Sequence, residues 1–111
     1  MSHDNVGLRL DHLYMLAKKP EWLADWYAET FGFKVQEGIV ICGAVVLVFQ
    51  NGEPDHHHDR PRFGFRCSSR EKFKQLAHKL DATVNADQVF ARFVAKDPEG
   101  YKFEVYWEAQ P

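Results

Sequence analysis

The 111-residue sequence has only two cysteines, no long apolar run and no block of charge of one sign. None of its apolar stretches approaches the roughly 20 residues that a membrane-spanning helix needs, so we expect no span. The formal net charge is −2, with Lys and Arg spread along the chain. Without a basic block, the sequence predicts neither nucleic acid nor a membrane surface as a partner.

The two cysteines, Cys42 and Cys67, both lie in apolar, strand-like stretches. We interpret them as reduced thiols, with a single disulfide as the less favoured alternative. The opening residues, MSHDNVGLRL, lack the charged and then apolar plan of a signal peptide. These two observations predict a cytoplasmic protein.

Hydrophobic residues make up 45% of the sequence and charged residues 27%, as is usual for a globular protein. A chain of this length buries roughly two thirds of its unfolded surface, enough for a real core. We therefore expect a single domain over residues 1–111.

The first half reads as a strand, a helix and three strands. Residues 8–16, LRLDHLYML, alternate in the manner of a strand, and residues 20–31 have the apolar spacing of a helix that begins at Pro20 and stops at Gly32. Three short strands are expected around residues 33–36, 39–42 and 44–50. The last of these is apolar throughout, which is typical of a strand covered on both sides.

The second half repeats this order. Residues 62–67 predict a strand, and Ser68 and Glu71 have the spacing of a capping box at the start of a second helix. Strands are expected near residues 82–86, 88–95 and 101–107. The chain thus divides into modules at about 8–50 and 62–108, joined by the polar linker 51–61, NGEPDHHHDRP.

Two modules of this pattern predict an α+β fold of two βαβββ units. Each unit would be a sheet with a helix on one face. The two uncovered faces would form curved sheets around a cavity, and such a cavity is the usual place for a ligand.

The stretch DPEGYKFEVYWE, residues 97–108, raises a question about Glu104. Asp97 to Gly100 predict a turn, and alternation then places Phe103 and Val105 on one face of a strand. Glu104 and Tyr106 would lie on the opposite face, toward the cavity. A glutamate in that position is expected to have a partner or a chemical role.

Three stretches together resemble the vicinal oxygen chelate superfamily, which includes glyoxalase I, bleomycin-resistance proteins and extradiol dioxygenases. They are LDHLYML in the first strand, WYAETFGFKV at the first helix and its exit, and DPEGYKFEVYWE at the end. The resemblance covers about residues 8–108 and implies the fold of two βαβββ modules. It also implies a homodimer, for which exposed edge strands provide a physical reason.

The resemblance implies metal ligands at His12 and Glu104, with Glu104 also able to carry a proton in catalysis. The other two ligand positions of the family fall on Arg62 and near Leu47, and neither side chain can bind a cation. The cofactor is therefore expected to be either none or one divalent ion (Zn, Mn, Fe or Ni). His56, His57 and His58 could supply a missing ligand, although a solvated linker is the favoured interpretation.

The remaining candidates are ligand-binding residues. Arg62 and Arg66 share a strand face and could bind a carboxylate or phosphate, or Arg62 could form an ion pair with Glu104. Glu104 could instead hydrogen-bond His12 or pair with a nearby Lys or Arg. Tyr14 and Tyr106, on the faces of His12 and Glu104, could line an aromatic pocket.

Three functions remain open at this point. The first is a small-molecule binding protein of the bleomycin-resistance type without a full metal site, which the missing ligands favour. The second is a metal-dependent lyase, isomerase or dioxygenase that uses His12 and Glu104. The third is a regulatory or assembly module without chemistry.

Overall fold

The structure is a computed structural model, and it describes residues 6–55 and 59–110. The chain folds into two compact units, Met1–Glu53 and Pro54–Pro111. The boundary between the units lies inside the polar segment 51–61.

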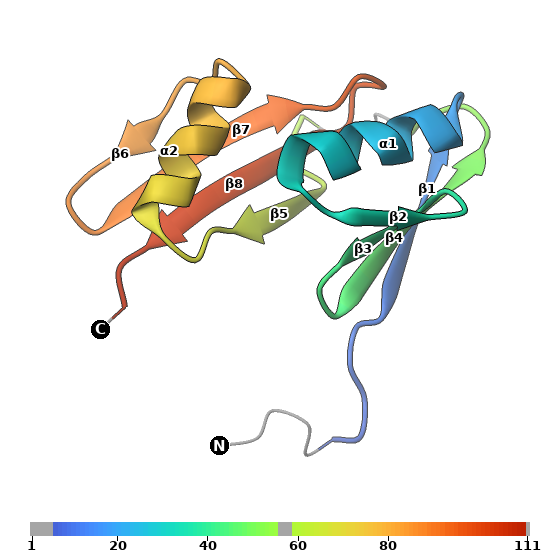
Figure 1. The fold of residues 1–111 in the computed structure, drawn as a ribbon, viewed down its shortest axis with the longest axis horizontal. Helices are drawn as coiled ribbons and strands as arrows, with labels where there is room; N and C mark the ends of the chain where they lie inside the picture. Colours follow the sequence, from blue (N-terminus) through green and yellow to red (C-terminus); the bar gives the residue numbers. More distant parts are fainter. Residues whose placement is uncertain (1–5, 56–58, 111) are drawn as a thin grey trace. The chain divides into compact units, whose positions relative to one another are not determined.

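The N-terminal unit is a four-stranded sheet with one helix (Figure 1). Its elements are β1 (His12–Ala17), α1 (Pro20–Phe31), β2 (Lys34–Gln36), β3 (Ile39–Cys42) and β4 (Val45–Asn51). The strand order is β1-β4-β3-β2, with β1 parallel to β4 and the other pairs antiparallel.

The C-terminal unit repeats the arrangement. Its elements are β5 (Phe63–Arg66), α2 (Arg70–Lys79), β6 (Asn85–Ala86), β7 (Phe90–Lys96) and β8 (Lys102–Glu108). The strand order is β5-β8-β7-β6, and β5 is parallel to β8. The predicted α+β fold of two βαβββ modules is confirmed.

Helix α1 has the limits that the sequence predicts. Pro20 occupies the first turn, where its missing N–H costs no hydrogen bond. Gly32 ends the helix in the left-handed conformation, φ 82°, and its N–H donates to Ala28 O at 2.8 Å. Tyr27 is fully buried and stacks on Phe49 of β4, which attaches the helix to the sheet.

Helix α2 begins one residue later than the predicted capping box requires. Ser69, not Ser68, is the N-cap, and its hydroxyl accepts from Lys72 N at 3.1 Å. The residue three positions after this cap is Lys72, so the reciprocal bond from Glu71 that defines a capping box is absent. The capping-box prediction is therefore wrong, although the helix forms.

Strand β1 is shorter than the predicted strand 8–16. Its pairing with β4 starts at His12 opposite Val46, and the residues before it have no partner strand. Leu8 and Leu10 are accordingly 78% and 62% exposed. Strand β4 is also less covered than predicted, since Leu47 and Phe49 are buried while Val46 and Val48 between them are partly exposed.

The DPEG turn is organised by the buried side chain of Asp97. Its Oδ1 accepts from Glu99 N at 2.9 Å and from Tyr101 N at 3.0 Å. The backbone adds Gly100 N to Asp97 O at 3.0 Å, with Gly100 at φ 95°. This turn determines where β8 starts and therefore which of its residues face α2.

None of the helices formed by the described residues is long and apolar enough to cross a membrane.

Replacing Asp97 tests how far the turn supports the fold. We expect Asp97→Ala to lower the free energy of unfolding by about 1–3 kcal/mol, because the buried N–H of Tyr101 and the partly buried N–H of Glu99 lose their acceptor. Asp97→Asn keeps a carbonyl oxygen at that point and should lose clearly less. Urea unfolding followed by circular dichroism measures both. Equal stability of the two variants would contradict the role of the side-chain acceptor.

Candidate functional site

Strand β8 divides its residues between two faces, as the sequence predicts. Phe103 and Val105 are fully buried against the helix side of the sheet. Glu104 and Tyr106 lie on the opposite face and are partly exposed. The side of the sheet away from α2 is therefore where polar chemistry is available.

We call this surface the open face of the C-terminal sheet. Strand register determines its members, because paired residues lie on the same side: Gly64 is opposite Glu104, and Arg66 and Arg92 are both opposite Tyr106. The open face is defined by Gly64, Arg66, Phe90, Arg92, Val94, Glu104 and Tyr106.

Glu104 is held by Arg92 of the neighbouring strand. Arg92 Nε donates to Glu104 Oε2 at 2.5 Å, and the two side chains are only 36% and 31% exposed. The pair is partly sheltered from water, so its charges are screened less than those of a fully exposed salt bridge. One oxygen of the carboxylate is thus engaged within the protein.

The other oxygen, Oε1, lies beside Gly64. A side chain begun at Gly64 would place its Cβ 3.7 Å from Oε1 and 3.5 Å from Glu104 O. Since glycine has no side chain, this space above the carboxylate stays open. Oε1 can therefore accept a hydrogen bond from a hydroxyl or amino group of a ligand.

Tyr106 provides an aromatic surface on the same face. The guanidinium carbon of Arg66 lies 5.5 Å from the centre of its ring, and the ring of Phe90 lies 6.3 Å away. Arg66 also contacts Glu108, at 3.8 Å between Nη1 and Oε1. The open face therefore combines two aromatic rings with two arginines. Each arginine lies next to a glutamate: Arg66 next to Glu108, and Arg92 next to Glu104.

Arg62 is not part of this group. Its Nη2 donates to Asp55 O at 2.5 Å, and its guanidinium carbon lies 5.1 Å from the centre of the Tyr101 ring. The alternative in which Arg62 pairs with Glu104 is wrong, because β7 places Arg92 next to the carboxylate instead. The structure thus separates Arg62 from Arg66, although the sequence put them on one strand face.

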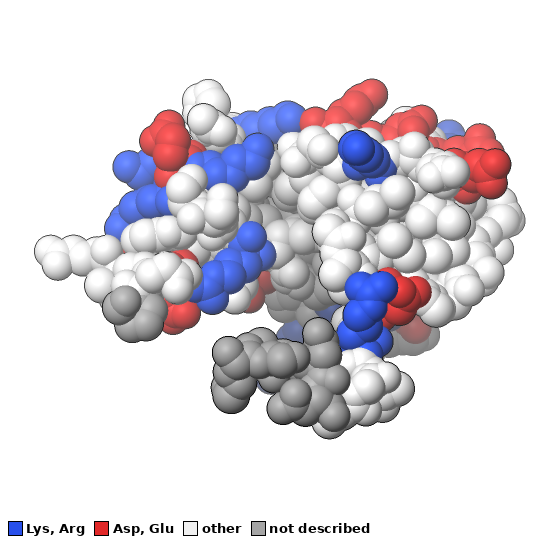
Figure 2. Space-filling model, turned by 60° about the horizontal axis from the view of Figure 1, so that its bottom comes forward, with Lys and Arg blue, Asp and Glu red and all other residues white. Residues whose placement is uncertain are grey.

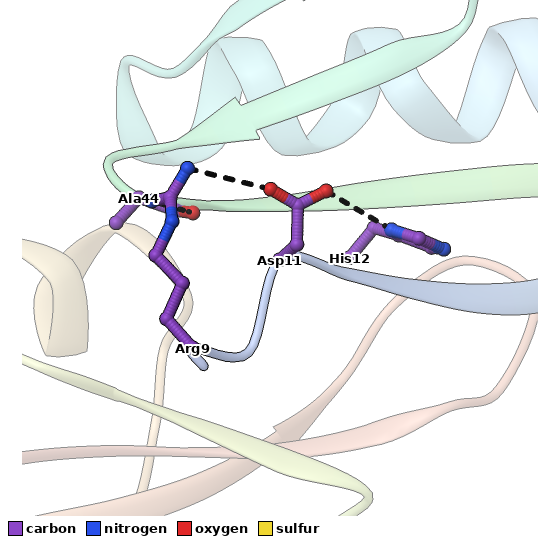
Figure 3. Close-up of polar contacts among 4 residues, drawn as sticks. All are labelled: Arg9, Asp11, His12 and Ala44. Atoms are coloured by element: carbon purple, nitrogen blue, oxygen red, sulfur yellow. Dashed lines mark hydrogen bonds and ion pairs between the residues drawn. The ribbon is translucent and has the colours of Figure 1, made fainter. Parts of the chain in front are cut away.

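In the N-terminal unit, His12 lies at the start of β1 and belongs to a short polar chain (Figure 3). Its Nδ1 lies 3.1 Å from Asp11 Oδ2, and Asp11 Oδ1 lies 3.5 Å from Arg9 Nη2. Arg9 Nη1 also donates to Ala44 O at 3.3 Å. A carboxylate on one ring nitrogen orients the imidazole and leaves Nε2 for a proton or a metal ion.

Tyr14 follows on the same side of β1. Its ring meets that of His12 edge to face, with 4.9 Å between the centroids, and it is 60% exposed. Leu16, Val46 and Val48 share the open side of the N-terminal sheet, and strand register adds the polar side chains of Lys34, Gln36 and Gln50.

A sequence profile of the Glyoxalase/Bleomycin resistance protein/Dioxygenase superfamily matches residues 9–105. The chain belongs to this superfamily. No curated protein matches the chain in sequence.

Solved structures support the same fold. A glyoxalase family protein from Bacillus anthracis superposes with a TM-score of 0.67 at 22% identity, over 91% of this chain and 95% of that one. The oxidase ChaP-H1 gives 0.70 at 16% identity, over 94% and 97%. Lactoylglutathione lyase from Agrobacterium tumefaciens gives 0.60 at 17% identity, over 89% and 92%. At these identities the likeness establishes the fold alone.

Members of the superfamily often bind a divalent metal, and the residues present here fit a full metal site poorly. His12 and Glu104 are donors, but Arg62 is a permanent cation and Leu47 is buried on the helix side of its sheet. Val46 is the residue paired with His12, and it is no ligand either. Within each unit, the described residues contain no group of three His, Cys, Asp or Glu side chains suited to a metal ion. The candidate ligands His56, His57 and His58 lie outside the described residues.

Sequence reasoning missed two residues of these sites, Arg92 and Asp11. Arg92 alternates with Phe90 and Val94, which indicates a face, but its pairing with Glu104 depends on the register between β7 and β8. Asp11 was visible as the neighbour of His12, and a carboxylate beside a candidate histidine is a usable signal.

The cysteines are not candidates for a nucleophile. Both are free, in agreement with the prediction of reduced thiols. Burial raises the pKa of Cys42 from 9.0 to about 11, and burial also raises the pKa of Cys67, partly offset by Lys72. A thiol that stays protonated is a poor nucleophile.

Cys42 should therefore alkylate slowly. At pH 8 a thiol of pKa about 11 is roughly 100-fold less ionised than one of pKa 9.0, so we expect a rate with iodoacetamide about 100-fold below that of the unfolded protein. The rate should rise about tenfold per pH unit up to pH 10. Mass spectrometry with Cys67→Ser isolates Cys42. Equal rates in folded and urea-unfolded protein would contradict the burial effect.

Proposed function

We propose that the protein binds a small organic molecule on the open face of the C-terminal sheet, without the full set of family metal ligands. The observation that carries this proposal is the Arg92–Glu104 pair. A metal ion at Glu104 would have to compete with a guanidinium already 2.5 Å from the carboxylate. A neutral or anionic organic ligand can use both groups without separating them.

The open face also limits the chemistry of the ligand. The rings of Tyr106 and Phe90 favour a planar or aromatic body. Arg66 and Arg92 favour a carboxylate or phosphate, which accepts from a guanidinium fork. Oε1 of Glu104, uncovered at Gly64, favours a hydroxyl or amino donor.

The residues of the open face support the binding of a ligand better than they support any particular reaction. The superposed proteins include an oxidase and a lyase. One fold thus carries several chemistries, and fold likeness does not choose among them. Sequestration of a small molecule, as in a bleomycin-resistance protein, needs only the contacts described above.

A metal-dependent lyase, isomerase or dioxygenase is the second candidate. The contact of Asp11 with His12 Nδ1 favours it, because a carboxylate behind an imidazole is the usual support of a metal-bound histidine. Under this alternative His12 and Glu104 would hold the ion, which would polarise an oxygen of the substrate. Glu104 would first have to leave Arg92.

A cytoplasmic homodimer remains the expected setting of either function. Each sheet ends in edge strands whose backbone groups are open to another chain, β1 and β2 in one unit and β5 and β6 in the other. Light scattering after gel filtration measures the mass directly.

Elemental analysis distinguishes the two candidates. We expect less than about 0.1 metal ion per chain in untagged protein purified without chelator and then incubated with Zn, Mn, Fe or Ni, because two side-chain ligands alone hold such ions weakly. Near-stoichiometric metal that is lost in His12→Ala and Glu104→Ala, and reduced in Asp11→Asn, would instead establish the metal-dependent alternative.

Variants at Gly64 test the ligand site. We expect some aromatic carboxylates to raise the melting temperature of the wild type while their methyl esters do not, because only the acids match the arginines. Gly64→Leu should abolish this difference by filling the space above Glu104, whereas Gly64→Ala, whose Cβ makes ordinary contacts, should retain it. Retention in Gly64→Leu, or no difference between acids and esters, would contradict the proposed site.

A further inference from the structure

A second polar pocket lies at the other end of β8, beside the DPEG turn. It has a volume of about 280 Å³ and is lined by Asp55, Arg60, Pro61, Arg62, Gly100, Tyr101 and Lys102. None of its lining residues is among those that define the open face, although alternation along β8 puts Lys102 on the same side of the sheet as Glu104. Its volume is at the low end of the range for small-molecule sites, so it fits a small ligand.

Three cations and one carboxylate line this pocket, and two of the cations are held by backbone carbonyls. Arg62 Nη2 donates to Asp55 O at 2.5 Å, and Lys102 Nζ donates to Asp59 O at 2.9 Å. Both acceptors are backbone carbonyls, which orient a cation but carry no net charge. Among residues 6–55 and 59–110, no carboxylate forms an ion pair with Arg60, Arg62 or Lys102.

Two other arginines of the unit do have a carboxylate partner. Arg66 and Arg92 each have a glutamate partner. The unit as a whole contains ten Lys and Arg residues against nine Asp and Glu. Figure 2 shows Lys and Arg side chains in blue on one face of the molecule, some of them beside the red side chains of Asp and Glu.

The backbone also places two of these cationic residues side by side on neighbouring strands. Arg62 N donates to Lys102 O at 2.8 Å, so the two residues are neighbours on adjacent parallel strands. Like charges that face one another across strands are destabilising. The ring of Tyr101 under Arg62 shelters one charge but leaves the repulsion in place. An anion between the side chains would remove it.

We propose that this pocket binds a dianionic oxyanion of the phosphate type. The lining carries three positive charges and one negative charge, so a dianion balances it. Arg62, fixed by Asp55 O and Tyr101, presents a guanidinium fork, and Lys102 adds a point charge. Arg60, which makes no hydrogen bond or ion pair with the described residues, is available to close on the anion. The proposal does not depend on the ligand of the open face.

Calorimetric titration of the full chain with inorganic phosphate tests the proposal. The titration is run at low ionic strength, with sodium chloride of equal ionic strength as the control for screening. Glycerol 3-phosphate in a parallel arm shows whether the site takes free phosphate or the phosphate group of an organic ligand. Malonate tests a dicarboxylate of the same charge.

Variants separate binding from a structural role. Arg60→Gln is the decisive one, because Arg60 holds no part of the described chain and its loss should weaken phosphate at least about tenfold. Arg62→Lys keeps the charge but loses the fork, and should weaken binding less than Arg62→Gln. Lys74→Gln on α2 removes one exposed charge outside the pocket and should leave the affinity unchanged within about twofold, since distant exposed charges are screened.

Saturable binding of either phosphate compound near one per chain, weakened in Arg60→Gln and not in Lys74→Gln, would support the proposal. Three results would overturn it: no binding beyond the chloride control, equal affinity in Arg60→Gln and wild type, or malonate binding more tightly than both phosphate compounds. Gly64→Leu, which fills the open face, should bind phosphate as the wild type does. The phosphate titration therefore tests this pocket even if the open face binds no ligand.

Discussion

The register of strand β8 is the constraint on which the C-terminal unit depends. The strand lies between β5 and β7. The alternation of its side chains therefore determines which residues of all three strands lie on the helix side and which lie on the open face. The buried side chain of Asp97 sets the start of the strand by holding the preceding turn. A slip of one residue would bury Glu104 and expose Phe103, which reverses every side chain at once. The core and the polar face are therefore two results of one register.

The two modules share a topology but differ in what their open sheet faces offer. The N-terminal face is mostly aliphatic around His12 and Tyr14, and its unit has four Lys and Arg residues against seven Asp and Glu. The C-terminal face carries the paired charges of Arg92 and Glu104. Repetition of the backbone plan thus leaves each surface free to specialise, because side chains away from the helix do not determine the fold.

Charge pairing distinguishes the two ends of β8. At Glu104 the arginine and the carboxylate neutralise each other, and the carboxylate keeps one open oxygen beside Gly64. At Arg62 and Lys102 the partners are backbone carbonyls, which leave the positive charge in place. The first arrangement suits a ligand with both donors and acceptors. The second suits an anion, because only an anion removes the remaining repulsion.

Local patterns in the sequence by themselves determined the helix at Pro20–Phe31, the DPEG turn, the alternation of β8 and the family, since each depends on neighbouring residues. Tertiary structure alone decided the partner of Glu104. Arg92 is twelve residues away and reaches the carboxylate only through the pairing of β7 with β8. The same holds for Arg62, which shares a strand face with Arg66 in the sequence but turns to Asp55 and Tyr101. Periodicity specifies a face, whereas contacts between strands depend on register, which periodicity does not contain.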